Sequence, residues 1–445
     1  MNPAEALRLD NTTRLAIVGA GGKTSAIFAL AKALKQRKPL AGPVLLTTTT
    51  HLAVEQCARA DTHFQIQYPD EVAQFARQLT AGVVLFTGTS INVGRISGPS
   101  TETLEAIFRL AEARGWPVLV EADGARLLPL KAPAEHEPPI PGWVNQVLVC
   151  AGLSGIDKSF GPETVHRPEI YAQLSGLADG DLISYQAITQ VLNHPSGGLK
   201  NIPPSVRRMA LLNQADTPEL QAVARRMADN LLDAYEAVII SSLSPTQGEP
   251  AIHAVIETVA GIILAAGSAS RFGQPKQLIH WQGETLVQRA ARTALRAGLA
   301  PVLVVTGAYA QEVEQAVADL PVKCVFNPHW EAGQGTSVAR GVLSLPDRTG
   351  AAVFLLADQP QVPMALISSL VESHSSTLMP ITGPLIDGQR GNPVLFDRIT
   401  FKDLSQLQGD IGGRAIFSRY PVQWLPWHDA SASLDIDTPA DLERL

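Results

Sequence analysis

Short runs of apolar, often β-branched residues recur along the chain, and each is followed by a loop of small residues and a stretch with helical periodicity. This alternation is typical of parallel sheets whose strands are buried on both faces by helices. Ligands of such sheets bind at the carboxyl ends of the strands, so the residues directly after each run are the candidates for chemistry. The predicted strands are Leu15–Val18, Val44–Leu46, Val83–Phe86, Val118–Val120, Val147–Val149, Ala237–Ile240, Ile262–Leu264, Val302–Val305 and Val353–Leu356.

A polar segment that contains Pro and Gly, Ser241–Pro250, divides the pattern into two halves, and a new strand–loop–helix unit begins near Ala260. The chain has 445 residues, enough for two or three domains of roughly 100–200 residues each. We therefore predict an α/β protein of two nucleotide-binding domains. The first, residues 1–250, is P-loop-like with a parallel sheet, and the second, residues 258–445, is Rossmann-like.

The charge and the cysteine content limit the possible binding partners and the cellular compartment. The net charge of −7 offers no basic footprint for a nucleic-acid backbone. Three cysteines, with no CxxC pair, suit a reducing compartment. The first ten residues carry Glu5 and Asp10 where a signal peptide is basic, and no apolar stretch approaches the ~20 residues that span a bilayer. We expect a cytoplasmic protein with neither nucleic acid nor membrane as a partner.

A glycine-containing turn follows the first predicted strand of the second domain and is rich in small residues and cations. Small residues let backbone N–H groups approach a phosphate. The planar guanidinium group of Arg271 and the mobile ammonium group of Lys276 can bind phosphate oxygens. These groups would cradle a triphosphate and, through Arg271 and Lys276 as catalytic residues, neutralise the departing pyrophosphate. A tight turn with two solvated cations is the alternative. The predicted nucleotide-binding residues here are Leu264, Ala265, Ala266, Gly267, Ser268 and Gly273.

Two acidic segments are candidates for a magnesium site in the same domain. Asp358 ends a buried strand just before Pro360, where a carboxylate could hold Mg²⁺ between phosphates, or could cap a helix. Asp437 precedes the Thr438-Pro439 helix start and is the second predicted metal ligand, with capping again as the alternative.

Four motifs of the second domain, in order, are LAAGSASRFGQPK, LLADQP, GNPVLF and DIDTP. Together they resemble the molybdenum-cofactor nucleotidyltransferases, the MobA-like branch of the GT-A-type nucleotidyltransferase fold, over Gly261 to Leu445. The resemblance implies that residues 327–337 form a base-proximal loop and that residues 409–414 border the acceptor site. Guanylyltransferases tend to have Leu-Ala-Gly-Gly where this chain has Leu-Ala-Ala-Gly, which resembles the cytidylyltransferase branch.

That branch implies transfer of CMP from CTP to Mo-molybdopterin with release of pyrophosphate and with Mg²⁺ as cofactor. A guanylyltransferase and a sugar-nucleotide pyrophosphorylase on the same fold remain alternatives. A third alternative is a cofactor carrier or maturation chaperone with a nucleotide switch.

The first domain opens with a second glycine-rich loop, GAGGKTS, between a predicted strand and a helix. Gly-Lys-Thr at a helix N-terminus binds phosphates through backbone N–H groups, the lysine and a hydroxyl-held Mg²⁺. The full P-loop pattern needs Gly where this chain has Ile17, so the loop is shortened, and a bare strand–helix turn is the alternative. The predicted nucleotide-binding residues are Gly19, Gly21, Gly22, Lys23, Thr24 and Ser25.

Two further segments extend this hypothesis. Asp123 follows a predicted strand and could join Thr24 as a metal ligand of the Walker-B type. The segment LLNQAD is similar to the Asn-Lys-x-Asp element of GTPases, with Asp216 accepting from a guanine edge and Asn213 bracing the loop. Gln214 replaces the lysine, and a helix cap is the alternative. ATP and GTP both remain open as the nucleotide.

The glycine loop, EADGA and PLKAPAEHEP together resemble the YqeC-like selenium-dependent hydroxylase accessory family over Leu15 to Ile240. That family has no well-defined biochemical activity, so the resemblance implies a context and not a reaction. Molybdenum hydroxylases use a cytosine-dinucleotide pterin, so both resemblances imply one pathway, with an apo molybdenum hydroxylase as a partner.

Overall fold

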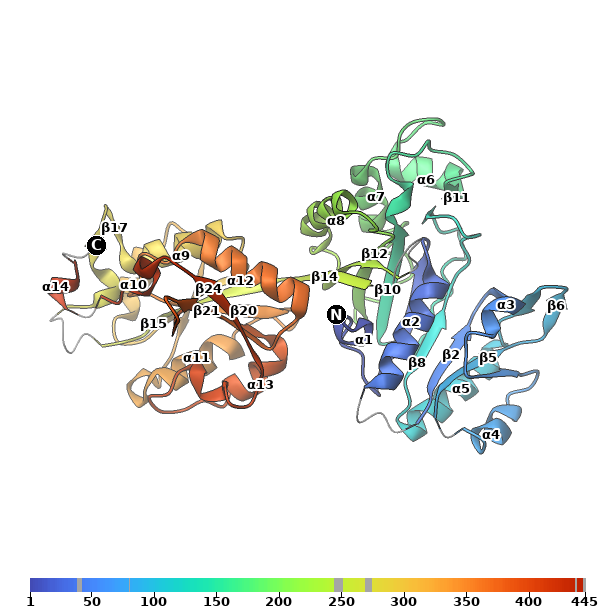
Figure 1. Ribbon diagram of the computed structural model, residues 1–445, viewed down its shortest axis with the longest axis horizontal. Helices are drawn as coiled ribbons and strands as arrows, with labels where there is room; N and C mark the ends of the chain where they lie inside the picture. Colours follow the sequence, from blue (N-terminus) through green and yellow to red (C-terminus); the bar gives the residue numbers. More distant parts are fainter. Residues whose placement is uncertain (38–41, 80, 244–250, 269–273, 437, 443–445) are drawn as a thin grey trace. The chain divides into compact units, whose positions relative to one another are not determined.

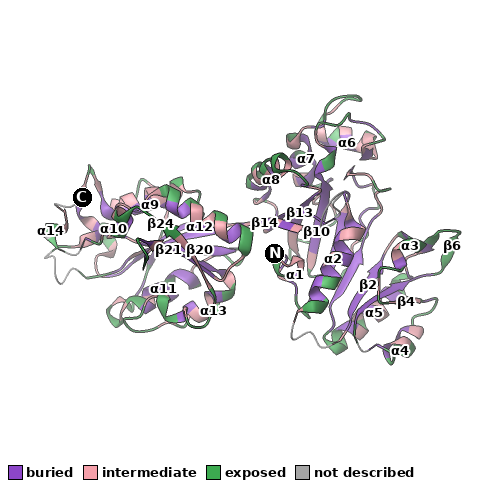
Figure 2. Cartoon of the chain, in the orientation of Figure 1, coloured by how far each residue is buried: buried purple, intermediate pink, exposed green. Residues whose placement is uncertain are grey.

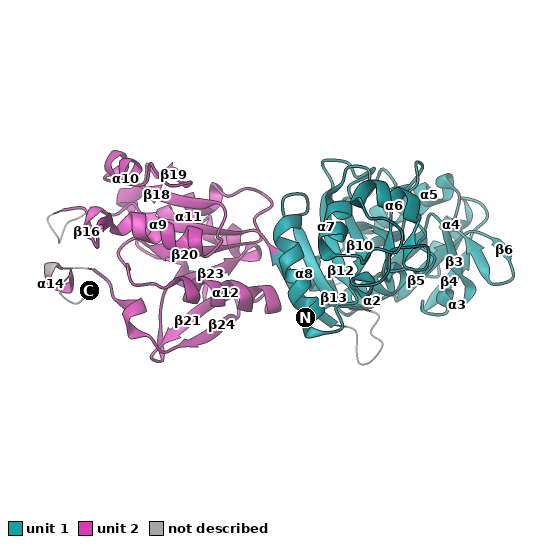
Figure 3. Cartoon of the chain, turned by 90° about the horizontal axis from the view of Figure 1, so that it is seen from above, with its two compact units in different colours: residues 1–256 teal, residues 257–445 magenta. Residues whose placement is uncertain are grey.

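The computed structural model describes residues 1–37, 42–79, 81–243, 251–268, 274–436 and 438–442. The chain forms two compact units, Met1–Ile256 and Glu257–Leu445 (Figures 1 and 3). Strand β14 (Ala251–Glu257), which the sequence pattern did not predict, joins the first sheet, so the first unit extends beyond residue 250. The two-domain α/β organisation is confirmed.

Within the described residues, the first unit is built on a nine-stranded sheet in the order β14-β13-β12-β10-β1-β8-β2-β5-β4. The registers from β13 to β4 are all parallel. The strands other than β14 are β1 (Arg14–Gly19), β2 (Val44–Thr48), β4 (Thr62–Gln65), β5 (Val83–Thr87), β8 (Val118–Glu121), β10 (Gln146–Gly152), β12 (Arg207–Asn213) and β13 (Ala237–Ser242).

Helices α2 and α8 of the first unit bury apolar faces against this sheet. In α2, Ile27, Leu30 and Leu34 are buried at helical spacing. In α5, Ser100 caps the first turn through its side chain and Gly115 ends the helix in the left-handed region. The helices are α1 (Pro3–Ala6), α2 (Lys23–Gln36), α3 (Val54–Cys57), α4 (Glu71–Ala76), α5 (Thr101–Arg114), α6 (Pro168–Ser175), α7 (Tyr185–Asn193) and α8 (Pro218–Leu231). Smaller sheets contain β3 (His51–Ala53), β6 (Ser90–Asn92), β7 (Arg95–Ser97), β9 (Leu130–Lys131) and β11 (Val165–His166).

The second unit has a sheet in the order β19-β18-β15-β20-β23-β21-β22, with β24 also paired to β21. The β19, β18, β15 and β20 registers are parallel, as predicted, but β23 runs antiparallel to both β20 and β21. Asp387 (φ 47°) and Gly388 (φ 80°) form the tight turn between β21 and β22. An Asp-Gly pair is a hairpin signal, so this part of the sheet cannot be wholly parallel.

The second unit contains short and long strands as well as helices on either side of them. The strands are β15 (Val259–Ala265), β16 (His280–Trp281), β17 (Glu284–Thr285), β18 (Val302–Thr306), β19 (Lys323–Phe326), β20 (Ala351–Leu356), β21 (Ile381–Ile386), β22 (Gln389–Arg390), β23 (Val394–Asp397) and β24 (Val422–Trp427). The helices are α9 (Leu286–Arg296), α10 (Ala310–Ala316), α11 (Gln334–Leu343), α12 (Met364–Thr377), α13 (Phe401–Leu404) and α14 (Pro439–Leu442).

Helices cover both faces of this sheet, with α9 and α12 on one face and α11 and α13 on the other (Figure 1). Adjacent residues of β15 point to opposite faces of the sheet. Ile263 packs in the apolar cluster that contains Leu370 of α12, and Ile262 packs in the cluster that contains Val342 of α11. The central strands β15, β18, β20 and β23 are therefore buried along almost their whole length (Figure 2). All nine predicted strands are confirmed, each within three residues of its expected start. In the described part of the chain, no helix has the length and apolar character that crossing a membrane requires.

Candidate functional site

A pocket of about 570 Å³ lies at the carboxyl ends of β15 and β20 in the second unit. It is lined by the turn after β15, by Lys276 and by Asp358, which follows β20. The structure therefore brings together two motifs that are distant in sequence. The predicted residues that line this pocket are Leu264, Ala265, Ala266, Gly267, Ser268, Lys276 and Asp358.

Three other predicted residues, Arg271, Gly273 and Asp437, lie outside the described residues. The segment before Asp437 is described, and the backbone N–H of Ile436 donates to the Asp358 carbonyl oxygen at 3.0 Å. Ile436 of the DIDTP motif therefore lies beside the residue at which the predicted metal carboxylate follows β20.

Gln277 holds the glycine turn, and the sequence reasoning did not identify it. Its side chain is 5% exposed, and its Nε2 donates to the carbonyl oxygens of Ala265 and Gly267, both at 3.3 Å. These two bonds orient the backbone on which a phosphate would rest. A glutamine directly after Lys276 carries no distinctive signal in one sequence, so only the geometry reveals this role.

Another part of the pocket wall includes Trp330 and Ser337, from the segment that resembles a base-proximal loop. Buried Asn327 fixes this segment, because its amide donates to Thr336 Oγ1 at 2.9 Å and to Ser337 Oγ at 3.0 Å. Asn327 Oδ1 also accepts from the backbone N–H of His329 at 3.0 Å. A buried side chain with these three bonds holds one loop conformation.

The loop around Gly409 packs against this wall, backbone against backbone. Gly333 has φ 107°, and a Cβ there would lie 2.4 Å from the carbonyl carbon of Gly409. The N–H of Gly335 donates to the Gly409 carbonyl oxygen at 2.9 Å. The close approach requires glycine at 333, and it positions Asp410 on the pocket wall.

A second pocket, of about 300 Å³, adjoins the first and shares Leu264, Gln334 and Leu356 with it. Its walls are apolar where Phe354 and Phe396 meet edge to face, with ring centroids 5.4 Å apart. Its polar lining residues are Asn392, Gln334, Arg414 and Asp435. Apolar walls with a few polar groups suit a flat heterocyclic ligand.

In the first unit, the loop of residues 19–22 joins β1 to α2. Gly22 is the N-cap of α2, with φ 108°, and no side chain caps the helix. Gly21 lies so close to β10 that a Cβ would be 2.2 Å from the N atom of Gly152. Lys23 is buried, and its Nζ donates to the Gly19 carbonyl oxygen at 2.6 Å and lies 3.2 Å from Asp123 Oδ1. Ser25 is half-buried in the first turn of α2.

The structure separates the predicted metal pair of Thr24 and Asp123. Thr24 Oγ1 donates instead to Oε2 of Glu121 at 2.9 Å. Asp123 Oδ2 accepts from the Gly19 N–H at 3.0 Å and pairs with Lys131 Nζ at 2.8 Å. Strand β8 ends at Glu121, so the two-residue alternation of side chains no longer applies at position 123. The carboxylate beside Thr24 is therefore Glu121, and Asp123 is the counterion of two lysines.

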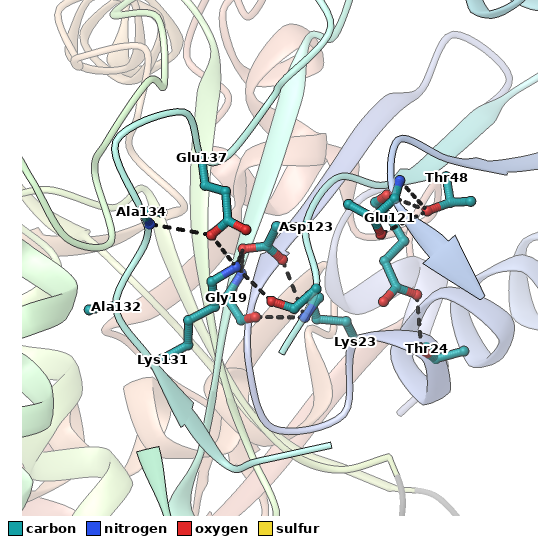
Figure 4. A network of polar contacts seen from close by, with 12 residues as sticks. Gly19, Lys23, Thr24, Thr48, Glu121, Asp123, Lys131, Ala132, Ala134 and Glu137 are labelled. Carbon is teal, nitrogen blue, oxygen red and sulfur yellow. Dashed lines mark hydrogen bonds and ion pairs between the residues drawn. The ribbon is translucent and has the colours of Figure 1, made fainter. Parts of the chain in front are cut away.

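A chain of buried ion pairs leads away from Asp123 (Figure 4). Lys131 Nζ also contacts Glu137 Oε2 at 2.8 Å, and Arg167 donates to both oxygens of Glu137, at 2.6 and 2.8 Å. Burial alone would lower the pKa of Lys23, but the charges of Asp123 and Glu121 outweigh it, so that pKa is raised.

Burial has the opposite effect on the carboxyl groups. It raises the pKa of Glu121, although Lys23 and Thr24 oppose the rise. At Glu137 burial also favours the neutral acid, but hydrogen bonds from Arg167 and Lys131 outweigh it and lower the pKa to about 2. Glu137 is therefore held charged inside the protein.

Asn213 contacts the glycine loop of the first unit. It is fully buried, its Nδ2 donates to the Gly21 carbonyl oxygen at 2.7 Å, and its Oδ1 accepts from Ser241 Oγ at 3.0 Å. Asp216 lies on the surface beyond β12, and Gln214 accepts a hydrogen bond from Ser154 Oγ at 2.6 Å. The structure thus places Asn213 against the loop and Asp216 apart from it, in solvent.

In the described ranges, no group of three or more His, Cys, Asp or Glu side chains could hold a metal by itself. Mg²⁺ is commonly held by one or two carboxylates together with substrate phosphates and water. An acidic residue lies at each glycine loop, Asp358 in the second unit and Glu121 in the first.

Gly333→Ala is expected to lower the free energy of unfolding by about 2 kcal/mol or more, because the new Cβ must push the loop around Gly409 away. Gly298 also has a positive φ, 77°, but no atom within 4 Å of a Cβ, so Gly298→Ala is the matched control. Urea denaturation of both variants measures the difference. Equal losses of stability would contradict the packing role of Gly333.

Glu137→Gln is expected to destabilise the first unit by about 3 kcal/mol at pH 7, since the folded-state pKa is about 2 against 4.5 for the free group. A lowered pKa stabilises the fold above pH ~4.5, and that stabilisation disappears as the pH falls towards 2. The gap between variant and wild type should therefore close between about pH 5 and pH 2. Denaturation over this range measures it, with exposed Glu135→Gln as control, and a constant gap would show that the charge of Glu137 is not the cause.

Two family models match the chain. The YqeC protein model matches residues 15–169, and the MobA-like NTP transferase domain model matches residues 261–424. The first match is shorter than the predicted resemblance, which extended to Ile240. Among curated relatives, the uncharacterized protein YqeC of Escherichia coli K12 is 32% identical over 204 residues, which are 45% of this chain and 76% of the relative.

Two relatives match the second unit. Nicotine blue oxidoreductase of Paenarthrobacter nicotinovorans is 32% identical over 197 residues, which are 42% of this chain and 96% of the relative. A probable molybdenum cofactor guanylyltransferase of Bacillus cereus strain Q1 is 27% identical over 182 residues, 40% of this chain and 88% of the relative.

Proposed function

Because the chain belongs to the YqeC family through its first unit and to the MobA-like NTP transferase family through its second, we propose that it is a molybdenum cofactor cytidylyltransferase. In this proposal the second unit transfers CMP from CTP to Mo-molybdopterin and releases pyrophosphate. The observation that carries it is the single pocket in which the glycine turn, Lys276 and Asp358 meet.

The proposed reaction needs positioning and charge neutralisation more than proton transfer. A phosphate oxygen of molybdopterin forms a bond to the α-phosphorus of CTP as the bond to pyrophosphate breaks. The attacking phosphate is already anionic, so a general base is not required. Backbone N–H groups of residues 265–268 would bind the triphosphate, and Lys276 would neutralise the charge that grows on pyrophosphate. We propose the same role for Arg271.

Magnesium fits the donor set of this pocket, because carboxylate oxygens are its preferred protein ligands. Asp358 would hold the ion, and Asp437, one residue after the Ile436 bond to the Asp358 carbonyl, is proposed as the second ligand. When bound, Mg²⁺ neutralises phosphate charge and aligns the triphosphate.

The adjoining pocket of about 300 Å³ is proposed to bind the pterin. Phe354 and Phe396 would contact the flat ring, and Arg414 suits the terminal phosphate. The choice of CTP over GTP is supported by Ala266, where the guanylyl branch tends to have Gly.

The YqeC unit supports an accessory role in the maturation of a molybdenum hydroxylase. We propose that the full chain presents the finished dinucleotide to the apo-hydroxylase, in the cytoplasm. Nucleotide-dependent capture of an apo-hydroxylase by the chain would support this role.

Pyrophosphate release separates the candidate reactions. Mo-molybdopterin with CTP should give the fastest release, and GTP and ATP should be poor donors. Selective turnover of a sugar phosphate would contradict the proposal. The relative named nicotine blue oxidoreductase favours a second candidate, an oxidoreductase that acts on nicotine blue. Redox turnover of nicotine blue by the full chain, without pyrophosphate release, would favour that candidate.

Asp358→Asn keeps the size of the side chain but removes the charge that would hold Mg²⁺, so turnover should fall by about 100-fold or more. Pyrophosphate release over a range of Mg²⁺ concentrations measures the loss. Asp387→Asn, an exposed residue at the turn between β21 and β22, is the control and should keep wild-type turnover. Unchanged turnover in Asp358→Asn would refute the metal role.

Lys276→Ala should slow the same reaction by about 10- to 150-fold, since one lost charge-assisted contact commonly costs about 1.5–3 kcal/mol. The loss should fall mainly on kcat, because the charge on pyrophosphate grows in the transition state. Lys323→Ala, exposed on β19, is the control. A rise in KM with kcat unchanged would assign Lys276 to substrate binding alone.

A further inference from the structure

The first unit has a second anion-binding arrangement, separate from the pocket of the second unit. Helix α2 has fourteen residues and begins at Lys23 without a side-chain cap, so its first N–H groups can donate hydrogen bonds to an anion. The side chain of Asn213 fixes the loop in front of it through the Gly21 carbonyl oxygen. The loop is therefore held by a buried side-chain contact.

An independent observation places a metal-binding carboxylate beside this helix. Glu121 is 7% exposed, and one of its oxygens accepts from Thr24 Oγ1. The other oxygen has no hydrogen-bond or ion-pair partner among the described residues, and it is accessible to solvent. Because a buried carboxylate is costly unless it is paired, an oxygen of this kind beside a threonine hydroxyl suits a cation.

Lys23 is buried and turned towards Asp123 and the Gly19 carbonyl oxygen. Asp123 would lose little if Lys23 moved, because it keeps Lys131 and the Gly19 N–H. A phosphate at the start of α2 can therefore compete for the Lys23 ammonium group. Asp123 itself is poorly suited to hold Mg²⁺, since two ammonium groups already face its carboxylate.

We propose that the first unit binds a nucleoside triphosphate together with Mg²⁺, with Thr24 and Glu121 as metal ligands and Lys23 exchanging Asp123 for the terminal phosphates. This assigns the metal role to Glu121 and makes Asp123 the resting partner of Lys23. A hydroxyl and a single carboxylate leave most of the Mg²⁺ coordination to phosphates and water. Mg²⁺ alone should consequently bind weakly, and nucleotide and metal should bind together.

Titration calorimetry of the full chain with ATP and with GTP, each with and without Mg²⁺, tests the proposal. Lys23→Ala should lower the stoichiometry by one bound nucleotide per chain, whether or not the second unit also binds nucleotide. Lys32→Ala, exposed on the same helix, is the matched control and should keep that bound nucleotide. Mg²⁺ without nucleotide should give no measurable heat at this site.

Glu121→Gln and Asp123→Asn then distinguish the two carboxylates. In the wild type, Mg²⁺ should raise the nucleotide affinity of the Lys23-dependent site by about tenfold. Glu121→Gln should remove this gain, and Asp123→Asn should retain it. If Glu121→Gln lowers the melting temperature strongly, Thr24→Val provides the same loss of a ligand, and Thr24→Ser should restore it. The proposal is overturned if no bound nucleotide depends on Lys23, or if Asp123→Asn abolishes the Mg²⁺ gain and Glu121→Gln keeps it.

Discussion

Parallel strands end at one edge of their sheet, and both candidate sites depend on this constraint. In the second unit it brings the turn after β15 and Asp358 after β20 to a common pocket. In the first unit it brings together the loop after β1, Glu121 at the end of β8 and Asn213 at the end of β12. The sequence separation within each set is large, so only the sheet register can assemble either site.

The two sites handle charge differently. The pocket of the second unit is open and about 570 Å³, which suits a substrate that brings its own metal and leaves as product. In the first unit, Lys23, Asp123, Lys131 and Glu137 are buried and paired with one another. If Lys23 turns to a ligand, Asp123 keeps Lys131 and the Gly19 N–H, so the set can release one lysine without leaving a buried carboxylate unpaired. Such a site suits a nucleotide whose phosphates take over the Lys23 ammonium group.

Much of the fold was predictable because buried parallel strands are almost wholly apolar, and all nine predicted strands are present. The antiparallel part of the second sheet was not predicted. Strand β24 is only half-buried, and a proline interrupts it, so it lacks the uninterrupted β-branched run of a buried parallel strand. The antiparallel direction of β22 depends on the tight turn at Asp387 and Gly388.

Of the candidate sites, the sequence identified the loops and the strand-end acids, since these follow directly from the pattern. It did not identify Gln277, whose role depends on where its amide points. It also could not separate Glu121 from Asp123, because both follow the same strand and only the end of β8 decides which carboxylate lies near Thr24.

The central claim is that the turn around Gly267 and Asp358 hold one metal-bound triphosphate. A crystal structure of the full chain with CTP and Mn²⁺, recorded at the manganese absorption edge, tests it most directly. The account predicts anomalous density at coordination distance from the Asp358 carboxylate, with the triphosphate over the backbone of residues 265–268. A metal–nucleotide complex bound elsewhere in the second unit, with Asp358 in contact with neither, would contradict it.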